Sequence, residues 1–470
     1  YLEDILRFAP HTLGAAEEKI VAQAGRMAGT GGTIRQIFNN AELPWPTVTL
    51  SDGEKVRLDD AAYTQYRQAP HIVDRDTVFR AFFRAHRDFR NTYGAALNSG
   101  VQSHVFYRDV LKYGSCLEAS LFPNNVPTRV YQQLLADVRA NLPTLHRYVR
   151  LRQRMMGLKQ IRYEDLYAPI VQEVELKFTP EEAMDLVIAA VAPLGREYAD
   201  TLAHGFRSGW VDWLPSTGKR SGAYSTGAYG VHPYQLQNFT GLYDEVGTVA
   251  HESGHSMHTF LANQRQPYVT AEYATFVAEV ASTLNENLLF HYMLDRTKDK
   301  ATRLFLLGSY LDNLRTTLFR QTMFAEFELK IHEMAEKGET LSGENLSKTY
   351  LEIVRRYYGH AQGVCKVDEL YGVEWSYIPH FFYNFYVYQY ATSIVASTAL
   401  ADGIHGEIAA GRGTAKRDAY LAMLASGSSK YPIDLLKDAG VDMTTAAPFR
   451  SAMREMNRVM DEMERLLAQK

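Results

Sequence analysis

Two histidines and the glutamate between them have the residue types and the spacing of a metal site, in the run His251-Glu252-Ser253-Gly254-His255. Residues four apart on a helix lie on one face, so both imidazoles can reach one ion. The Glu252 carboxylate then points beside that ion, where a general base is needed to take a proton from a metal-activated water. Apolar residues recur at helical spacing around the motif and predict the helix that carries it: Val246, Val249, Met257, Phe260 and Leu261.

A third ligand is expected, because zinc sites that act on substrates usually have three protein ligands and one open position. Glu279 lies in the apolar helical stretch 274–289, where a carboxylate is costly unless it is paired or binds a metal. The chain between His251 and Glu279 is long enough to return as an antiparallel helix. Glu286, two turns later, either orients a ligand histidine through its second ring nitrogen or is a solvated helix carboxylate. Asp244 is expected in the same orienting role.

Several longer runs resemble the oligoendopeptidase F branch of the thimet oligopeptidase family. They are GKRSGAYSTGAYG from Gly218, HPYQLQNF from His232, HESGHSMH from His251 and FVAEVASTLNE from Phe276, with further matches from Leu43, Tyr163, Ile378 and Ser426. The resemblance spans essentially the whole chain. It implies a mostly helical, two-lobed zincin-type peptidase with a deep channel that cleaves short peptides internally and holds one Zn²⁺ per chain.

Helical patterning dominates the chain, and we predict a mainly α-helical fold with a small β-sheet near the zinc helix. Trp45 to Leu58 alternates like a β-hairpin with Asp52-Gly53 at its turn, and Thr179-Pro180 opens a capped helix. We divide the chain into an N-terminal helical lobe, 1–195, and a catalytic lobe, 196–470. Because the chain starts at Tyr1 rather than Met, we interpret it as a fragment or a processed form, in which a further N-terminal segment that family members usually carry is missing.

The composition of the chain limits the classes of partner that it can bind. The net charge of −4 and the absence of a basic stripe argue against nucleic acid, and no apolar run approaches 18 residues, which argues against a membrane span. Only two cysteines occur, Cys116 and Cys365, which fits a reducing cytoplasm. Short peptides are the expected partners, with monomer and homo-oligomer both open.

The segment 219–241 is rich in glycine and tyrosine, and alternation from Tyr234 predicts a short strand. An exposed strand edge beside the zinc can pair with an extended peptide, main chain to main chain. An ordinary packed hairpin is the alternative. The residues expected to contact substrate are Tyr224, Tyr229, His232 and Tyr234.

The run Trp375 to Tyr390 is extremely aromatic, and we interpret it as a helix that mostly fills the core. A scissile peptide bond develops an oxyanion that neutral O–H or N–H donors stabilise, and His380 is one candidate donor. On that helix, spacings of three and four put Tyr383, Tyr386 and Tyr390 on one face. The family resemblance implies such a His and tyrosines, although its His-to-Tyr gap is one residue shorter than here.

The sequence therefore predicts a zinc endopeptidase with Glu252 as general base. A metallocarboxypeptidase or dipeptidase is the first alternative, and it would need a cation for the terminal carboxylate of the substrate, supplied by Arg207, Lys219 or Arg220. A non-catalytic, peptide-binding zinc protein is the second alternative, and His258 would then close the metal site as a fourth ligand. Co²⁺ or Mn²⁺ could replace Zn²⁺ in such a ligand set.

Overall fold

The computed structural model describes residues 2–171, 174 and 176–469. It confirms a mainly helical chain with two small sheets. The chain forms two compact units: unit 1 comprises Tyr1–Pro123, Leu145–Ile170 and Thr322–Tyr388, and unit 2 comprises Asn124–Thr144, Val171–Gln321 and Gln389–Lys470. The division at residue 195 drawn from the sequence is sequential, whereas each compact unit combines three separated segments.

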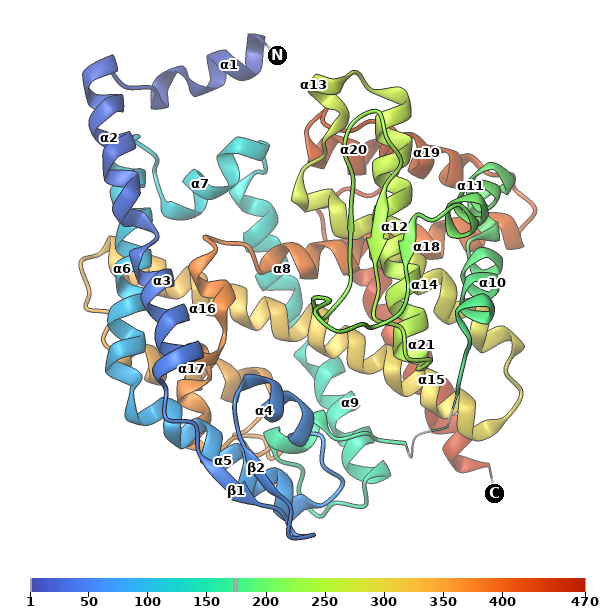
Figure 1. The fold of residues 1–470 in the computed structure, drawn as a ribbon, viewed down its shortest axis with the longest axis horizontal. Coiled ribbons are helices and arrows are strands. Elements are labelled where there is room, and N and C mark those ends of the chain that lie inside the picture. The colour runs from blue at the N-terminus through green and yellow to red at the C-terminus, as the bar shows by residue number, and fades with distance from the viewer. Residues whose placement is uncertain (1, 172–173, 175, 470) are drawn as a thin grey trace. The chain divides into compact units, whose positions relative to one another are not determined.

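Unit 1 is a set of helices with one β-hairpin (Figure 1). Its longest helices, α5 and α6, pack on the 3₁₀ segment η7 (Glu369–Tyr377), and α6 also packs on α3 and α17. Its other elements are α1 (Leu2–Phe8), α2 (Ala15–Ala28), α3 (Thr30–Ile37), β1 (Thr47–Thr49), β2 (Lys55–Arg57), α4 (Asp60–Tyr66), α5 (Ile72–Asp88), α6 (Arg90–Val110), α7 (Cys116–Leu121) and α17 (Gly343–Tyr357), with most of α9 (Leu142–Met155) and α16 (Gln321–Glu336).

Unit 2 is a set of helices with one three-stranded sheet of order β3-β5-β4. The sheet lies against α12, and α12 also packs on α14 and α10. The elements are α8 (Thr128–Ala140), α10 (Pro180–Ala190), α11 (Arg196–Arg207), β3 (Val211–Asp212), β4 (Tyr224–Thr226), β5 (Tyr234–Leu236), α12 (Tyr243–Arg265), α13 (Tyr268–Ala271), α14 (Thr275–Arg296), α15 (Lys300–Asn313), α19 (Ala415–Leu424), α20 (Pro432–Asp438) and α21 (Ala447–Ala468), with most of α18 (Tyr388–Ala409).

Local sequence signals explain where elements begin and turn. The predicted hairpin is confirmed, with Val48 opposite Val56 in an antiparallel pair and Gly53 at a positive φ of 90° in its turn. The predicted cap of α10 is also confirmed, since the Thr179 hydroxyl accepts from the Glu182 N–H at 3.2 Å and the Glu182 carboxylate accepts from the Thr179 N–H at 2.8 Å. Among the described residues, no helix has both the length and the apolar composition that a transmembrane segment needs.

Candidate functional site

Helix α12 presents the histidine motif with a fixed orientation. At its start the Glu245 carboxylate accepts hydrogen bonds from the backbone N–H groups of Thr240 and Leu242, at 2.7 and 3.0 Å, which satisfies donors at the helix entrance. Val249 and Met257 are fully buried on one side of the helix. His251 and His255 lie one turn apart on another side, with side chains 27% and 18% exposed.

Glycine at position 254 lets α12 approach α14 closely. A Cβ atom added there would lie 2.5 Å from the Ala281 carbonyl oxygen and 2.6 Å from the Ser282 Cα, which is closer than non-bonded atoms pack. The Asn285 side chain also bridges the two helices by donating to the Ala250 carbonyl at 3.2 Å. The close crossing brings the N-terminal part of α14, and with it Glu279, to the histidine face of α12.

Three donor atoms from these two helices meet in space. The Glu279 Oε2 atom lies 3.3 Å from His251 Nε2 and 3.4 Å from His255 Nε2, and the three ligand atoms all lie within 4.8 Å of one another. Zinc–ligand bonds of about 2.0–2.2 Å in a tetrahedron separate neighbouring ligand atoms by about 3.3–3.6 Å. Among the residues that the structure describes, this is the one group of His, Cys, Asp and Glu donors close enough to hold a metal, and its residue types and spacing fit zinc.

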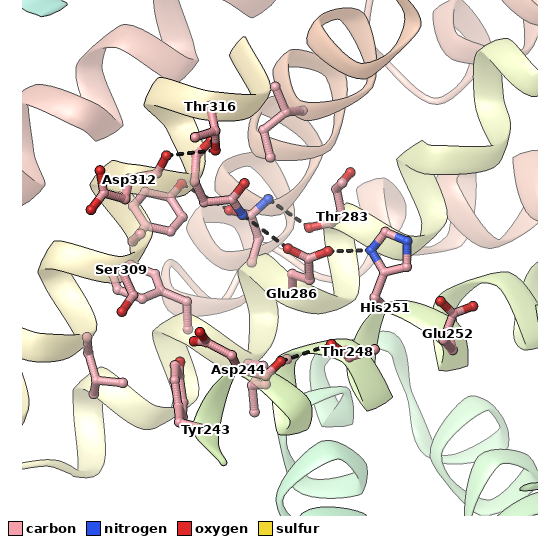
Figure 2. A pocket seen from close by; sticks show the side chains of 18 of the residues that line it. Tyr243, Asp244, Thr248, His251, Glu252, Thr283, Glu286, Ser309, Asp312 and Thr316 are labelled. Atoms are coloured by element: carbon pink, nitrogen blue, oxygen red, sulfur yellow. Dashed lines mark hydrogen bonds and ion pairs between the residues drawn. The ribbon is translucent and has the colours of Figure 1, made fainter. Parts of the chain in front are cut away.

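Two of the three candidate ligand residues, His251 and Glu279, have a hydrogen-bond partner that orients them. The Glu286 Oε1 atom contacts His251 Nδ1, so the proton of that ring lies on Nδ1 and leaves Nε2 for a metal. The Ser282 hydroxyl donates to Glu279 Oε2 at 2.9 Å. Asp244, in contrast, lies on the first turn of α12, and Figure 2 shows it lining the cavity apart from the His251 ring.

Without a metal, the two imidazoles and Glu279 act as charge partners. Burial by itself raises the pKa of Glu279, but hydrogen bonds from His251 and His255 outweigh it and hold the pKa well below its usual range. Burial lowers the pKa of His251, and hydrogen bonds to Glu279 and Glu286 reverse that effect and raise the pKa well above its usual value. The carboxylate therefore stays ionised, as a metal ligand must.

The Glu252 carboxyl group lies beside the donor group and is only 7% exposed. Burial raises its pKa above the ordinary value, while the nearby His251 and His255 lower it. Glu252 and His251 both line two adjoining cavities of about 630 and 540 Å³, the first of which is drawn in Figure 2. The smaller cavity also contains His255 and Glu279, so that all three donors and Glu252 open into one space.

The small sheet contributes an edge to this cavity. Strand β4 is an edge strand, and its Tyr224 and Ser225 line the cavity with the metal donors. The expected strand at Tyr234 is present, but β5 is the central strand, so the edges of the sheet are β3 and β4, and β4 is the edge strand that lines this cavity.

The other residues expected to contact substrate have different surroundings. The Tyr229 hydroxyl donates to the Gln266 carbonyl at 3.0 Å, the His232 ring stacks on Trp210 at 5.4 Å, and Tyr234 is 47% exposed on β5.

A buried polar network behind α12 was not found from the sequence. The Gln235 amide donates to the Ser256 hydroxyl at 2.9 Å, and that hydroxyl is 2.8 Å from the hydroxyl of Ser225 on β4. Ser253, in the middle of the histidine motif, is fully buried and lies 3.5 Å from the same amide nitrogen. The available signal was the pair of small polar residues Ser253 and Ser256, three apart on the helix. The network ties the edge strand to the helix that carries the metal donors.

The aromatic run does not form the single helix that the spacing predicted. The 3₁₀ segment η8 (Pro379–Phe382) ends at Tyr383, and α18 begins only at Tyr388. Between them Asn384 and Phe385 have positive φ values of 44° and 56°, which no α-helix contains. The prediction that three tyrosines share one helix face is therefore wrong.

The candidate oxyanion donors are divided between the units. In unit 1 the rings of His380, Tyr383 and Tyr386 cluster with centroids 5.6–6.2 Å apart. Tyr390, on α18 in unit 2, lines the cavity with the metal donors. Tyr390 thus lies at the site, whereas a catalytic part for the other three residues stays a prediction.

The residues named for the two alternatives have the following surroundings in the structure. His258 is buried, and its ring stacks on Tyr273 at 3.5 Å, outside the donor group. The Lys219 ammonium group pairs with the Asp212 carboxylate at 3.1 Å and donates to the Leu214 carbonyl. Within the described residues, Arg207 and Arg220 do not line either cavity.

Substituting Gly254 by Ala should destabilise the protein by about 1–3 kcal/mol, because the new methyl group overlaps the backbone of α14. Gly247, on the same helix, has no atom within 4 Å of an added Cβ. Gly247→Ala is therefore the matched control, and it should stabilise by about 0.5–1 kcal/mol. Urea unfolding of both variants measures the difference. Equal stabilities would contradict the close crossing.

The strained turn at Asn384–Phe385 rests on a fully buried carboxyl group. Glu328 accepts the Phe385 N–H at 2.7 Å, and burial raises its pKa to about 8. The unfolded chain loses this proton near pH 4.5, so between pH 4.5 and 8 the native state binds more protons and stability falls as pH rises.

Glu328→Gln, which cannot ionise, should therefore match the wild type near pH 4.5 and be more stable by about 2–4 kcal/mol at pH 9. Denaturant unfolding across this pH range measures the effect, with Glu339→Gln, an exposed carboxyl in the same unit, as control. A stability difference that does not change with pH would refute the assignment.

Comparison with known proteins adds independent information. Residues 65–455 match the model of peptidase family M3, and residues 1–44 match that of oligopeptidase F. The chain is 40% identical over 466 residues to oligopeptidase PepF of Bacillus subtilis, covering 99% of this chain and 68% of the relative. It is 36% identical to group B oligopeptidase PepB of Streptococcus agalactiae, covering 100% of this chain and 76% of the relative. Its fold is similar to the crystal structure of oligoendopeptidase-F from Enterococcus faecium, with a TM-score of 0.82 and 33% identity over 100% of this chain and 78% of that one.

Proposed function

The chain belongs to peptidase family M3 and is a metalloendopeptidase of the oligoendopeptidase F type, and from this premise we propose how it works. It hydrolyses internal bonds of short, unstructured peptides with one zinc ion held by His251, His255 and Glu279. The observation that carries the proposal is the donor group itself, whose separations of 3.3 and 3.4 Å suit a tetrahedral ion. Zinc would supply a Lewis acid there, which polarises the scissile carbonyl and acidifies an attacking water.

Glu252 is the proposed general base. Its carboxylate takes a proton from the attacking water and then delivers it to the leaving amine. Two observations support this role: Glu252 adjoins both histidines on α12, and its burial raises the pKa, which makes the carboxylate a stronger base. No other carboxylate in the smaller cavity combines these features, since Glu279 is a ligand and Glu286 binds His251.

The edge of β4 is the proposed binding surface for the peptide main chain. An extended peptide can add to this edge through backbone hydrogen bonds, which do not depend on the identity of its side chains. Such pairing suits a peptidase that acts on many sequences. Tyr224 and Ser225, which line the cavity, support this placement.

Tyr390 is the proposed donor to the oxyanion in unit 2, because its side chain lines the same cavity as the zinc ligands. His380, Tyr383 and Tyr386 remain further candidates on the basis of the sequence. A neutral O–H donor aimed at the developing charge lowers the barrier without becoming charged itself. We also propose a reducing compartment, the cytoplasm, since Cys116 and Cys365 are both buried and no disulfide joins them.

An internally quenched peptide blocked at both ends tests the proposed reaction. We expect cleavage at internal bonds, because an endopeptidase needs no free terminus. The zinc-free protein serves as the control and should leave the peptide intact until zinc is restored. Loss of single terminal residues from unblocked peptides, with the blocked peptide untouched, would overturn the proposal in favour of an exopeptidase.

A further inference from the structure

We infer that Asn313 and Thr317 are positioning residues that fix the metal ligand His251 through Glu286. The inference rests on the proposed function, in which His251 binds zinc. Asn313 is the last residue of α15, and Thr317 lies in the π-helical segment η6 (Leu314–Arg320) that follows it.

A chain of hydrogen bonds joins these residues to the metal site. The Thr317 hydroxyl donates to Asn313 Oδ1 at 2.7 Å, and Asn313 Nδ2 donates to Glu286 Oε2 at 3.1 Å. The other carboxylate oxygen of Glu286 contacts His251 Nδ1. Figure 2 shows the Glu286 carboxylate facing the His251 ring, with a dashed line joining the two. Both oxygens of Glu286 are therefore occupied, and the carboxylate cannot rotate without losing one bond.

The chemistry of the groups sets the direction of every bond. An ionised carboxylate only accepts hydrogen bonds, so the amide nitrogen of Asn313 must face Glu286 and the amide oxygen must face Thr317. The Thr317 hydroxyl supplies the proton that this oxygen accepts. At the other end Glu286 accepts from His251 Nδ1–H, which leaves the lone pair of Nε2 directed at the donor group. This series of hydrogen bonds thus selects one tautomer and one orientation of the His251 ring.

Thr317 and its neighbour Thr316, both in η6, make different hydrogen bonds. Asn313 and Thr317 both line the smaller cavity, with the metal donors. The Thr316 hydroxyl instead donates to the carbonyls of Asp312 and Asn313, within its own helical segment. Of these two successive threonines, Thr317 therefore belongs to the hydrogen bonds that lead to His251, and Thr316 bonds to backbone carbonyls of its own segment. Short π segments of this kind are frequent at functional sites.

Zinc affinity and the ligand field of bound Co²⁺ test the inference in the full chain. Asn313→Asp places a carboxylate against Glu286, and it should weaken zinc about tenfold or more in competition with a chromophoric chelator. It should also change the visible absorption spectrum of the Co²⁺-substituted protein, which reports the ligand geometry. Thr317→Val should weaken zinc about threefold, and Thr316→Val, the matched control, should bind as the wild type does.

The possible results distinguish a failure of the inference about Asn313 and Thr317 from a failure of the proposed function. If Asn313→Asp fails to fold, Thr317→Val carries the test alone, because it exchanges one hydroxyl for a methyl group. Wild-type zinc affinity and an unchanged Co²⁺ spectrum in both folded variants, with zinc binding lost in His251→Ala, would overturn the inference and leave the proposed function standing. A wild-type chain that binds no zinc through His251 would overturn the proposed function, and the inference with it.

Discussion

Replacing Glu252 with Gln should leave zinc affinity nearly unchanged and lower kcat by roughly a hundred- to ten-thousand-fold, the range that a positioned general base contributes. Gln keeps the size of the side chain and cannot take a proton from the attacking water. The carboxylate is not one of the three donors that meet at the metal position, so the ligand set is preserved. Metal content by mass spectrometry and turnover of a quenched peptide measure the two quantities on one preparation.

The control for this variant is Glu272→Gln, which makes the same chemical change at an exposed carboxylate between α13 and α14. Its turnover should equal that of the wild type. A zinc-loaded Glu252→Gln protein that keeps turnover within a few-fold of the wild type would refute the assignment of the base.

Replacing Glu279 with Ala should lower zinc affinity by at least about 100-fold, because losing even a residue that only orients a ligand costs about 10–100-fold. The variant keeps both histidines but loses the oxygen that lies 3.3 and 3.4 Å from their Nε2 atoms. Turnover at low zinc should fall with the zinc content and recover in part when zinc is raised. Equilibrium dialysis against buffered zinc measures the affinity.

Glu272→Ala is the control for the ligand variant, and it should bind zinc as the wild type does. A Glu279→Ala protein with wild-type affinity would show that the carboxylate of α14 is not a ligand. Glu279→Gln should give an intermediate affinity, since an amide oxygen is a weaker ligand than a carboxylate.

The donor group could be predicted from the sequence because its rules are local. Two histidines four apart on an amphipathic helix share a face by geometry alone. Glu279 was identified because burying a carboxylate in an apolar helical segment costs free energy unless the carboxylate is paired or binds a metal. The structure places these three residues together and places Glu286 against the His251 ring, which was one of the two alternatives for that residue.

The features that could not be predicted from the sequence depend on contacts between segments that are distant along the chain. Helical spacing favoured one aromatic helix, but backbone contacts of Phe385 with the buried Glu328 stabilise a turn there, and pattern alone does not reveal this long-range partner. The requirement for glycine at position 254 became visible only when the backbone of α14 was found against it.

The role of Asn313 was hidden for the same reason. Asn313 and Glu286 are separated along the chain, and nothing in the helical pattern of α15 distinguishes this amide from a solvated one. The two compact units also combine segments that a sequential division cannot group, such as Thr322–Tyr388 with the first 123 residues.

Diffraction data collected at the zinc absorption edge from the zinc-loaded protein test the central claim most directly. The account predicts one anomalous peak per chain, within bonding distance of His251 Nε2, His255 Nε2 and a Glu279 carboxylate oxygen, and with no fourth protein ligand. A peak elsewhere in the chain, or one enclosed by a fourth protein atom such as a His258 nitrogen, would contradict it.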